Sequence, residues 1–401
     1  MKAAKQFKIA LYFFAAIALL GLILRMVPVY PLGIKYSNYL HAHSHVAFLG
    51  WLHGAFISFI SYIFLKDKLE TRFFKFIYIF TIANIIGMYF SFPIQGYKLF
   101  SILFLSLFLI GTYLYLYYFF KHKTDLDKYP ATYKFIKAGL FLQFLSSISP
   151  WSLGVIIKVF GKESNLYKYD IFYYLHFQYN GWFLFASIGL TLYLLERRNI
   201  TLPKNLVTYL YNLMLIAVFF GYFSNTLWAK PGLIFNFLSF VGASAEIAAF
   251  FVLLLILKRY YRYLNHTISS FSYLFLQVVF YTFMLKAVLQ FMGSFQYYAD
   301  LSYQIRDFII GYLHLIMLGI FTPFLLVLGH ELGFFKLHKK AFYIFYSGFI
   351  ITENIIFIRA IFTWFKTPLQ PSITNWILFI FTFWMAIGIW WLTFHKQKTK
   401  I

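Results

Sequence analysis

Long runs of apolar residues alternate with short, mostly basic, polar segments along the whole chain. A helix needs about 20 mostly apolar residues to cross a hydrocarbon core of about 30 Å, and roughly twelve runs reach that length. Backbone polar groups in lipid must be hydrogen-bonded within their own segment, so each run is predicted to be a helix. The expected spans are residues 8–30, 39–65, 73–93, 98–120, 133–157, 171–195, 205–226, 232–257, 269–292, 307–330, 341–363 and 373–394.

The composition agrees with a polytopic membrane protein. Hydrophobic residues make up 62% of the 401 positions, charged residues only 12%, and the mean hydropathy is +0.72. A soluble domain has about 25% charged residues. The connections between the apolar runs are short, and none has the character of a soluble domain or a flexible linker. We therefore expect residues 1–401 to form a single integral membrane domain, an all-α bundle with about 12 transmembrane helices.

The formal net charge of +23 is explained by membrane topology. Lys and Arg concentrate in the N-terminal tail, in every second connection and in the C-terminal tail, while the intervening connections hold few. Cytoplasmic loops are enriched in Lys and Arg, so both termini are predicted to lie in the cytoplasm. The expected location is a bacterial inner membrane. Because the charge follows topology, we expect no nucleic-acid partner.

The first apolar run and the absence of cysteine each restrict the chemistry. The run follows basic residues, as in a signal peptide, but it is longer than the usual apolar core of about 7–15 residues, and no small-residue cleavage pattern follows. We expect a retained first helix. The chain has no cysteine, which excludes disulfides, thiolate-ligated iron and covalently attached c-type heme. Any heme in this protein is therefore noncovalent.

Three histidines, His41, His43 and His45, stand at alternate positions where the second apolar run begins. Histidine is costly in lipid, and neutral imidazole is a common ligand for transition metals and heme iron. On a helix, His41 and His45 share one face while His43 points almost opposite. Gly50 and Gly54 lie below His43 and predict a strip free of side chains on which a porphyrin can lie. This favours His43 as an axial ligand, with His41 and His45 at a second site or at the propionates.

Two further helices carry a histidine at a similar depth. His176 lies near the start of the sixth helix and His314 near the start of the tenth, within about 12 Å of the outer interface in the predicted topology. Each of the three helices has a glycine shortly after its histidine, as in the pairs His43 and Gly50, His176 and Gly181, and His314 and Gly319. His53 lies deeper, and its role is open. The other histidines fall at cytoplasmic loops or ends and are not expected to be ligands: His122, His266, His330, His338 and His395.

Among the ionisable residues inside predicted spans, four are candidates for a functional role. Arg359 and Lys286 fall in the outer half, where they either pair with heme propionates or extend to the headgroups. Glu246 and Glu353 fall near the middle of their helices. Each is either neutral and hydrogen-bonded or part of a proton relay, and position alone does not choose between these roles.

The whole pattern resembles subunit I of the heme–copper oxidases, especially the cbb-type oxidases and the related nitric oxide reductases. The resemblance covers the topology of twelve helices with both termini inside and histidines on helices two, six and ten. Residues 40–51, LHAHSHVAFLGW, look like the opening of the family's second helix, which supplies one axial ligand of the low-spin heme. Residues 307–314, DFIIGYLH, look like the start of the tenth helix, and His314 matches the histidine that ligates the same heme. The resemblance implies a bis-histidine b-type heme.

The departures from the family pattern argue against oxygen or nitric oxide reduction. Tyr312 stands where the family has the proximal ligand of the oxygen-reacting heme. Residues 227–233, LWAKPGL, look like the stretch that precedes the copper-binding histidine pair, yet no adjacent histidine pair exists in this sequence. Only His176 remains where the family's sixth helix gives a copper ligand. One imidazole does not make a three-ligand site, so copper is not expected.

Three functions follow as expectations. The first is a membrane protein with one noncovalent b-type heme on His43 (or His41) and His314, passing electrons or sensing redox state in a respiratory setting; bis-histidine iron has no open position for a substrate. The second is a transporter or channel for metal ions or protons, with an outer histidine site and a path along Glu246, Glu353 and Lys286. The third is a non-redox assembly subunit. Expected partners are membrane lipid and a redox partner or additional membrane subunit.

Overall fold

The computed structural model describes residues 2–395, and in that range the chain forms helices and connecting loops without a strand. Eleven helices in this range are long and apolar enough to cross a membrane. The predicted all-α polytopic membrane bundle is therefore confirmed. The predicted sixth span is also helical, over Asn165–Glu196, but it is not among the eleven, and its apolar run contains the polar residues Gln178 and Asn180.

The helices group into two compact units, which we describe separately. Unit 1 comprises Met1–Thr124 and Leu325–Ile401, and unit 2 comprises Asp125–Phe324. The expectation of one integral membrane domain stays a prediction.

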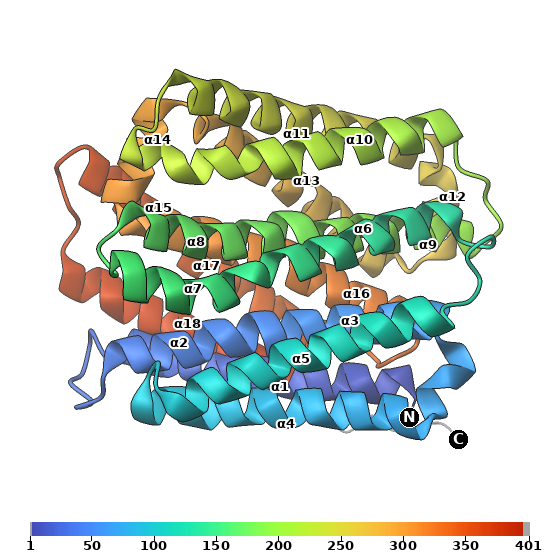
Figure 1. Cartoon of the computed structure of the whole chain (residues 1–401), viewed down its shortest axis with the longest axis horizontal. Coiled ribbons are helices and arrows are strands. Elements are labelled where there is room, and N and C mark those ends of the chain that lie inside the picture. The colour runs from blue at the N-terminus through green and yellow to red at the C-terminus, as the bar shows by residue number, and fades with distance from the viewer. Residues whose placement is uncertain (1, 396–401) are drawn as a thin grey trace. The chain divides into compact units, whose positions relative to one another are not determined.

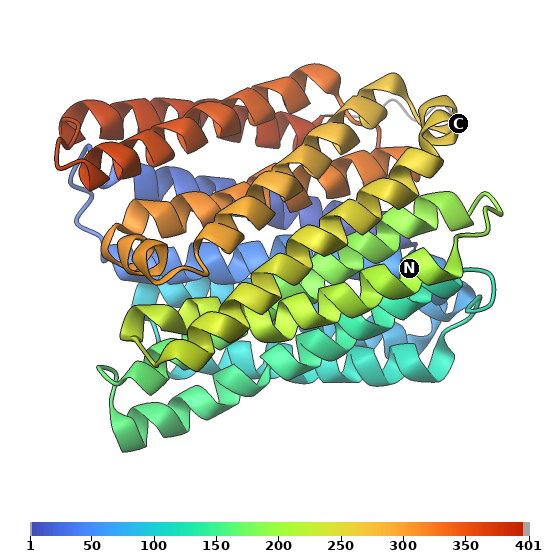
Figure 2. The ribbon, with the colours of Figure 1, turned by 90° about the horizontal axis from the view of Figure 1, so that it is seen from above.

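Unit 1 contains the first four membrane-spanning helices and the last two. Its elements are α1 (Ala3–Met26), α2 (Tyr36–His45), η1 (Val46–Leu52), α3 (His53–Phe64), η2 (Lys66–Glu70), α4 (Arg72–Gln95), α5 (Leu99–His122), α17 (Lys339–Trp364), α18 (Pro371–Phe394) and α16 (Thr322–Glu331) from Leu325 onward. Helices α4 and α5 lie side by side (Figure 1). Helices α17 and α18 form a second pair, drawn in red and orange in Figure 2.

Helix α1 lies at the core of unit 1. Between Lys8 and Arg25 it carries no charged residue, which is typical of a helix within a bundle or a membrane. The Phe14 ring stacks on Trp51 of η1 with 4.7 Å between ring centroids and meets Phe345 of α17 edge-on at 5.7 Å. The indole N–H of Trp390 on α18 donates to the backbone carbonyl of Ala15 at 3.0 Å. These contacts fix α1 against the helical segment that follows His41, His43 and His45 and against the C-terminal pair α17 and α18.

Unit 2 contains the middle of the chain. Its elements are α6 (Pro130–Ser146), α7 (Ile148–Phe160), α8 (Asn165–His176), η3 (Phe177–Phe183), α9 (Leu184–Glu196), α10 (Lys204–Gly221), η4 (Tyr222–Ala229), α11 (Leu233–Arg259), α12 (Tyr261–Thr267), α13 (Ser270–Met292), α14 (Gln296–Gln304), α15 (Arg306–His314) and η5 (Leu315–Phe321). Short helix α14 occupies a stretch that the sequence predicts as a plain connection. Helices α10 and α11 lie side by side (Figure 1).

A buried carboxylate caps the N-terminus of helix α6 in unit 2. The first turn of a helix has backbone N–H groups without intrahelical partners. Glu196, at the end of α9, accepts from the N–H groups of Ala131 and Thr132 at the start of α6, both at 2.9 Å, and from the Thr132 hydroxyl at 2.7 Å. A negative charge at a helix N-terminus also interacts favourably with the helix dipole. This contact positions α6 against α9.

Small residues allow the closest helix packing in unit 2. A Cβ atom at Gly242 of α11 would overlap the backbone nitrogen of Gly221 on α10. Helices in membranes associate through such small residues, because their backbones can then approach closely. The next turns of α11 continue with Ala243, Ala245 and Ala249, and Glu246 lies among them. Glu246 is therefore held deep inside the unit.

Candidate functional site

Three histidines directly precede three π-helical segments of equal length. The segments are η1, η3 and η5, each seven residues long, and the histidine before each is His45, His176 and His314, respectively. A glycine stands at the fifth position of every segment: Gly50, Gly181 and Gly319. Such wide turns within α-helices are rare and frequently occur at functional sites. The chain therefore repeats one local structure three times at the helices that carry the candidate ligands.

This repeat changes one detail of the sequence interpretation. We paired His43 with Gly50 at a spacing of seven residues, whereas the other two pairs are spaced by five. In the structure, His45 is the equivalent of His176 and His314, because all three directly precede a π-helical segment. The spacing His-x4-Gly is the same in all three segments of the sequence, and it would have aligned His45 rather than His43 with His176 and His314.

His43 points toward α1. Its Nδ1 lies 3.1 Å from the carbonyl oxygen of Ile17, and a Cβ atom on Gly21 would lie 3.1 Å from its Cε1. A carbonyl can only accept, so Nδ1 carries the proton and Nε2 is the nitrogen with the lone pair. Histidines that bind metals commonly donate their second ring N–H to a backbone carbonyl in this way. The donor chemistry of His43 thus fits an axial ligand.

His41 and His45 face the other side of α2. The His45 Nε2 lies 2.6 Å from the Tyr97 hydroxyl, and the His45 ring stacks on Phe92 of α4 with centroids 4.7 Å apart. The His41 ring meets the Tyr97 ring edge-on at 4.6 Å. The predicted division of the three histidines between two helix faces is confirmed. Their shared partner Tyr97, in the turn between α4 and α5, had no signal in the sequence.

The predicted open strip beneath His43 is absent, which corrects that part of the interpretation. A Cβ atom at Gly50 would lie 2.9 Å from the Phe13 ring, and one at Gly54 would lie 3.3 Å from the Ala10 Cβ. Both glycines therefore serve close packing against α1. The glycine strip therefore no longer supports His43 as an axial ligand, and the support for His43 is its ring nitrogen geometry.

His176 is buried, and both of its ring nitrogens are engaged. Nε2 donates to the carbonyl of Val218 at 2.7 Å, so Nδ1 is the acceptor. Nδ1 accepts from the side-chain amides of Asn180 at 3.1 Å and Asn225 at 3.2 Å. This arrangement leaves no lone pair for a metal, so we do not include His176 in the proposed site. Asn225 on η4 was not predicted.

Beside His176, unit 2 holds a buried ion pair. The Lys286 ammonium on α13 contacts the Glu246 carboxylate on α11, and each side chain is only 2% exposed. Lys286 also donates to Gln290 Oε1 at 2.8 Å, and the Tyr312 hydroxyl on α15 donates to the same oxygen at 2.9 Å. From the sequence we expected Lys286 either to pair with a heme propionate or to extend to the lipid headgroups. In the structure it pairs with Glu246 instead. We call these four residues the Lys286 network.

The Lys286 network lies close to His176 and has one unsatisfied acceptor. A Cβ atom at Gly221 would lie 3.0 Å from Gln290 Nε2 and 3.6 Å from His176 Cε1, so both side chains meet at this glycine. Glu246 Oε2 is buried without a hydrogen-bond partner. A buried acceptor without a donor is costly, and such atoms point to protonation or to a bound donor.

Three further residues of the sequence prediction are Arg359, Glu353 and His314. Arg359 of α17 donates from Nη1 to Asn375 of α18 at 3.0 Å, within unit 1. Both carboxylate oxygens of Glu353 are buried without a hydrogen-bond partner. His314, half-buried at the end of α15, belongs to unit 2.

A search for metal-binding side chains in the described part of the chain and two comparisons with known proteins found no match. Within residues 2–395, no three His, Asp or Glu side chains gather as a set that could hold a metal ion. No protein-family model matches the chain, and no curated protein matches its sequence.

Proposed function

We propose that this protein is an integral membrane protein with one noncovalent b-type heme, ligated by His43 of α2 and His314 of α15, and that it transfers electrons or senses redox state. The observation that supports this proposal best is the hydrogen bond from His43 Nδ1 to the Ile17 carbonyl, which leaves Nε2 for iron. A bis-histidine heme supplies one-electron chemistry without a position for substrate. Reduction of oxygen is not part of the proposal.

The chain's own residues have defined roles in this proposal. The Ile17 carbonyl orients the His43 ring and increases its basicity. His41 and His45, held by Tyr97, are the second-site or propionate-contacting residues, and Arg359 is a further propionate partner. The setting is a bacterial inner membrane with both termini in the cytoplasm. A redox partner or an additional membrane subunit supplies and accepts electrons.

A spectrum of the purified protein tests the proposal. Protein made in heme-replete cells is expected to show a Soret band, a reduced-minus-oxidised spectrum and a positive pyridine hemochrome assay. His43→Ala and His314→Ala are each expected to lose the heme, and parallel His41→Ala and His45→Ala variants assign the ligand on α2. His266→Ala is the matched control, because His266 is exposed on α12. Heme-free wild-type protein, or heme retained in His314→Ala, overturns the proposal.

The Lys286 network favours a second candidate, proton transfer across the membrane. Ionisable side chains inside a membrane commonly mark ion or proton pathways. The pair has a buried acid, a buried base and the unpaired Glu246 Oε2, which together can hold and release a proton. In proteoliposomes containing a pH-sensitive dye, wild-type protein is then expected to dissipate an imposed pH gradient and Glu246→Gln is not. Equal rates in the wild type and Glu246→Gln exclude this role.

A further inference from the structure

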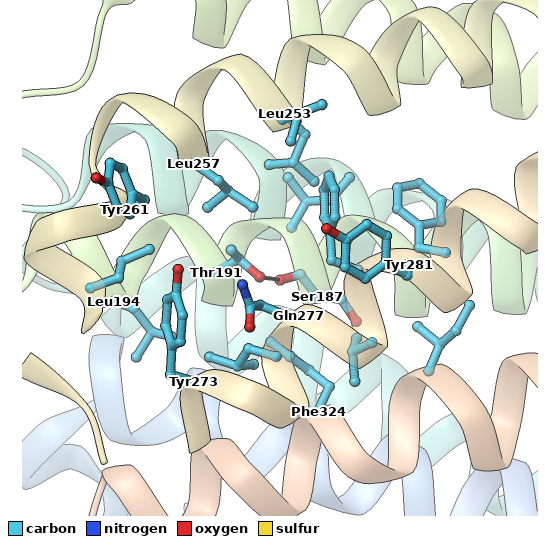
Figure 3. A pocket seen from close by; sticks show the side chains of 18 of the residues that line it. Ser187, Thr191, Leu194, Leu253, Leu257, Tyr261, Tyr273, Gln277, Tyr281 and Phe324 are labelled. Atoms are coloured by element: carbon cyan, nitrogen blue, oxygen red, sulfur yellow. Dashed lines mark hydrogen bonds between the residues drawn. The ribbon is translucent and has the colours of Figure 1, made fainter. Parts of the chain in front are cut away.

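Unit 2 contains a cavity of about 280 Å³ between α9, α11, α12 and α13 (Figure 3). Its walls are mostly apolar, with Ile188, Leu253, Leu257 and Phe324 among the lining residues. The smallest small-molecule sites in proteins have volumes of about 300 Å³. This cavity is close to that lower limit, so it can hold part of one extended hydrocarbon chain rather than a whole lipid.

Polar residues concentrate at one end of this cavity. Lys258 lies in the last turn of α11, Tyr261 follows on α12 and Tyr273 lies in the first turn of α13. Arg262 donates from Nε to the Tyr261 hydroxyl at 3.0 Å, so a second positive charge is next to the lining. In the predicted topology this end faces the cytoplasm. The mouth of the cavity is therefore basic.

Gln277 lies deeper in the same cavity, and its side chain is exposed. It is the eighth residue of α13, about 10 Å along the helix from its start, and Figure 3 shows its side chain among the lining residues beside Ser187 and Thr191. The hydroxyls of Ser187 and Thr191 donate to carbonyls of their own helix, each at 2.8 Å. Gln277 has no hydrogen bond within residues 2–395. The Gln277 side chain is exposed within the cavity, so its amide can donate to a polar group of an occupant.

We propose that this cavity binds an anionic phospholipid of the cytoplasmic leaflet. Lys258 binds the phosphate, the Gln277 amide donates to an ester carbonyl, and one acyl chain occupies the apolar walls. The order of a basic mouth, a polar middle and an apolar interior matches the order of groups along a glycerophospholipid. Basic pockets between helices at the cytoplasmic side recognise anionic headgroups in this way. The site is independent of the heme proposal.

Lipid retention by the full chain tests this site. The protein is extracted in mild detergent, exchanged with phosphatidylglycerol or phosphatidylcholine of identical acyl chains, and examined by native mass spectrometry. One phosphatidylglycerol is expected to remain bound in preference to phosphatidylcholine. Lys258→Gln is expected to lower its affinity about fivefold, since a lysine near the membrane surface contributes about 1 kcal/mol. Lys204→Gln is the matched control, because Lys204 is exposed at the start of α10 and does not line the cavity.

A second variant tests the deeper contact. Gln277→Leu removes one hydrogen bond and is expected to weaken binding of ester-linked phosphatidylglycerol about threefold to tenfold. Ether-linked phosphatidylglycerol lacks the carbonyl, so it is expected to bind the wild type and Gln277→Leu equally. Equal retention of the two headgroups, an unchanged affinity in Lys258→Gln, or a neutral isoprenoid bound in place of phospholipid would each overturn the proposal.

Discussion

The Lys286–Glu246 pair is the least ordinary feature at the scale of single residues. Charged groups taken out of water are stable only when paired and hydrogen-bonded. Here the ammonium meets the Glu246 carboxylate and Gln290 Oε1, and Tyr312 reaches the same oxygen. Each side chain in the network thus depends on the others. Removing a single member leaves an uncompensated group in a buried region.

Lys286→Met is expected to destabilise the protein strongly. Breaking a buried pair by removing one partner costs about 3–5 kcal/mol, because the remaining charge is unpaired. The double variant Lys286→Met/Glu246→Gln is expected to recover most of this loss. Thermal unfolding in detergent measures both effects, with Lys204→Met as an exposed control that changes stability by less than about 0.5 kcal/mol. A double variant no more stable than Lys286→Met would show that the pairing is not what stabilises this region.

Sequence reasoning identified these ionisable residues but not their partners. Lys286, Glu246 and Glu353 were recognisable because charge inside an apolar run is rare. Pairing depends on how α11 is rotated about its axis against α13, and an apolar helix gives no amphipathic signal for that rotation. The spacing of four residues between Lys286 and Gln290 was readable and would have indicated their contact.

At the scale of elements, the three π-helical segments explain how different sequences present a histidine in the same way. The residues between histidine and glycine are VAFL, FQYN and LIML, and the only identity among them is the final leucine of the first and third. A seven-residue π-helical segment has no periodic signature distinguishable from an α-helix, so the sequence predicted continuous helices at these places.

The break between α6 and α7 is another local feature that the sequence did not predict. It occurs where the Ser146 and Ser147 hydroxyls donate to backbone carbonyls of the preceding turn. Such bonds bend helices.

Gly242→Ala is expected to disrupt the packing of α10 on α11. The added Cβ overlaps the Gly221 backbone, which cannot give way as a flexible side chain would. Overpacking costs about 1–3 kcal/mol or more. Gly154→Ala on α7 is the matched control: no atom lies within 4 Å of its Cβ position, and alanine in a helix is about 1 kcal/mol more favourable than glycine. Equal melting temperatures of the two variants would contradict this description of the α10–α11 contact.

At the scale of the whole molecule, the apolar runs were sufficient to predict an all-α bundle and most of its spans. Their length and composition decide whether a helix can cross a membrane, and both are local properties. Division of the chain into two units was not predicted, because it depends on which helices pack together over long sequence distances. Unit 1 takes both ends of the chain, as in the contact of Trp390 with Ala15.

The orientation of the bundle is directly testable because the chain contains no cysteine. Single cysteines at Lys128 and Lys162, both exposed, stand on opposite ends of the span Pro130–Phe160. The excess of Lys and Arg before this span predicts that position 128 is cytoplasmic and position 162 external. In intact spheroplasts, a membrane-impermeant maleimide is therefore expected to label Lys162→Cys and to label Lys128→Cys only after lysis. The cysteine-free parent gives the background, and the reverse labelling pattern would place both the outer histidines and the basic cavity mouth on the opposite sides from those inferred here.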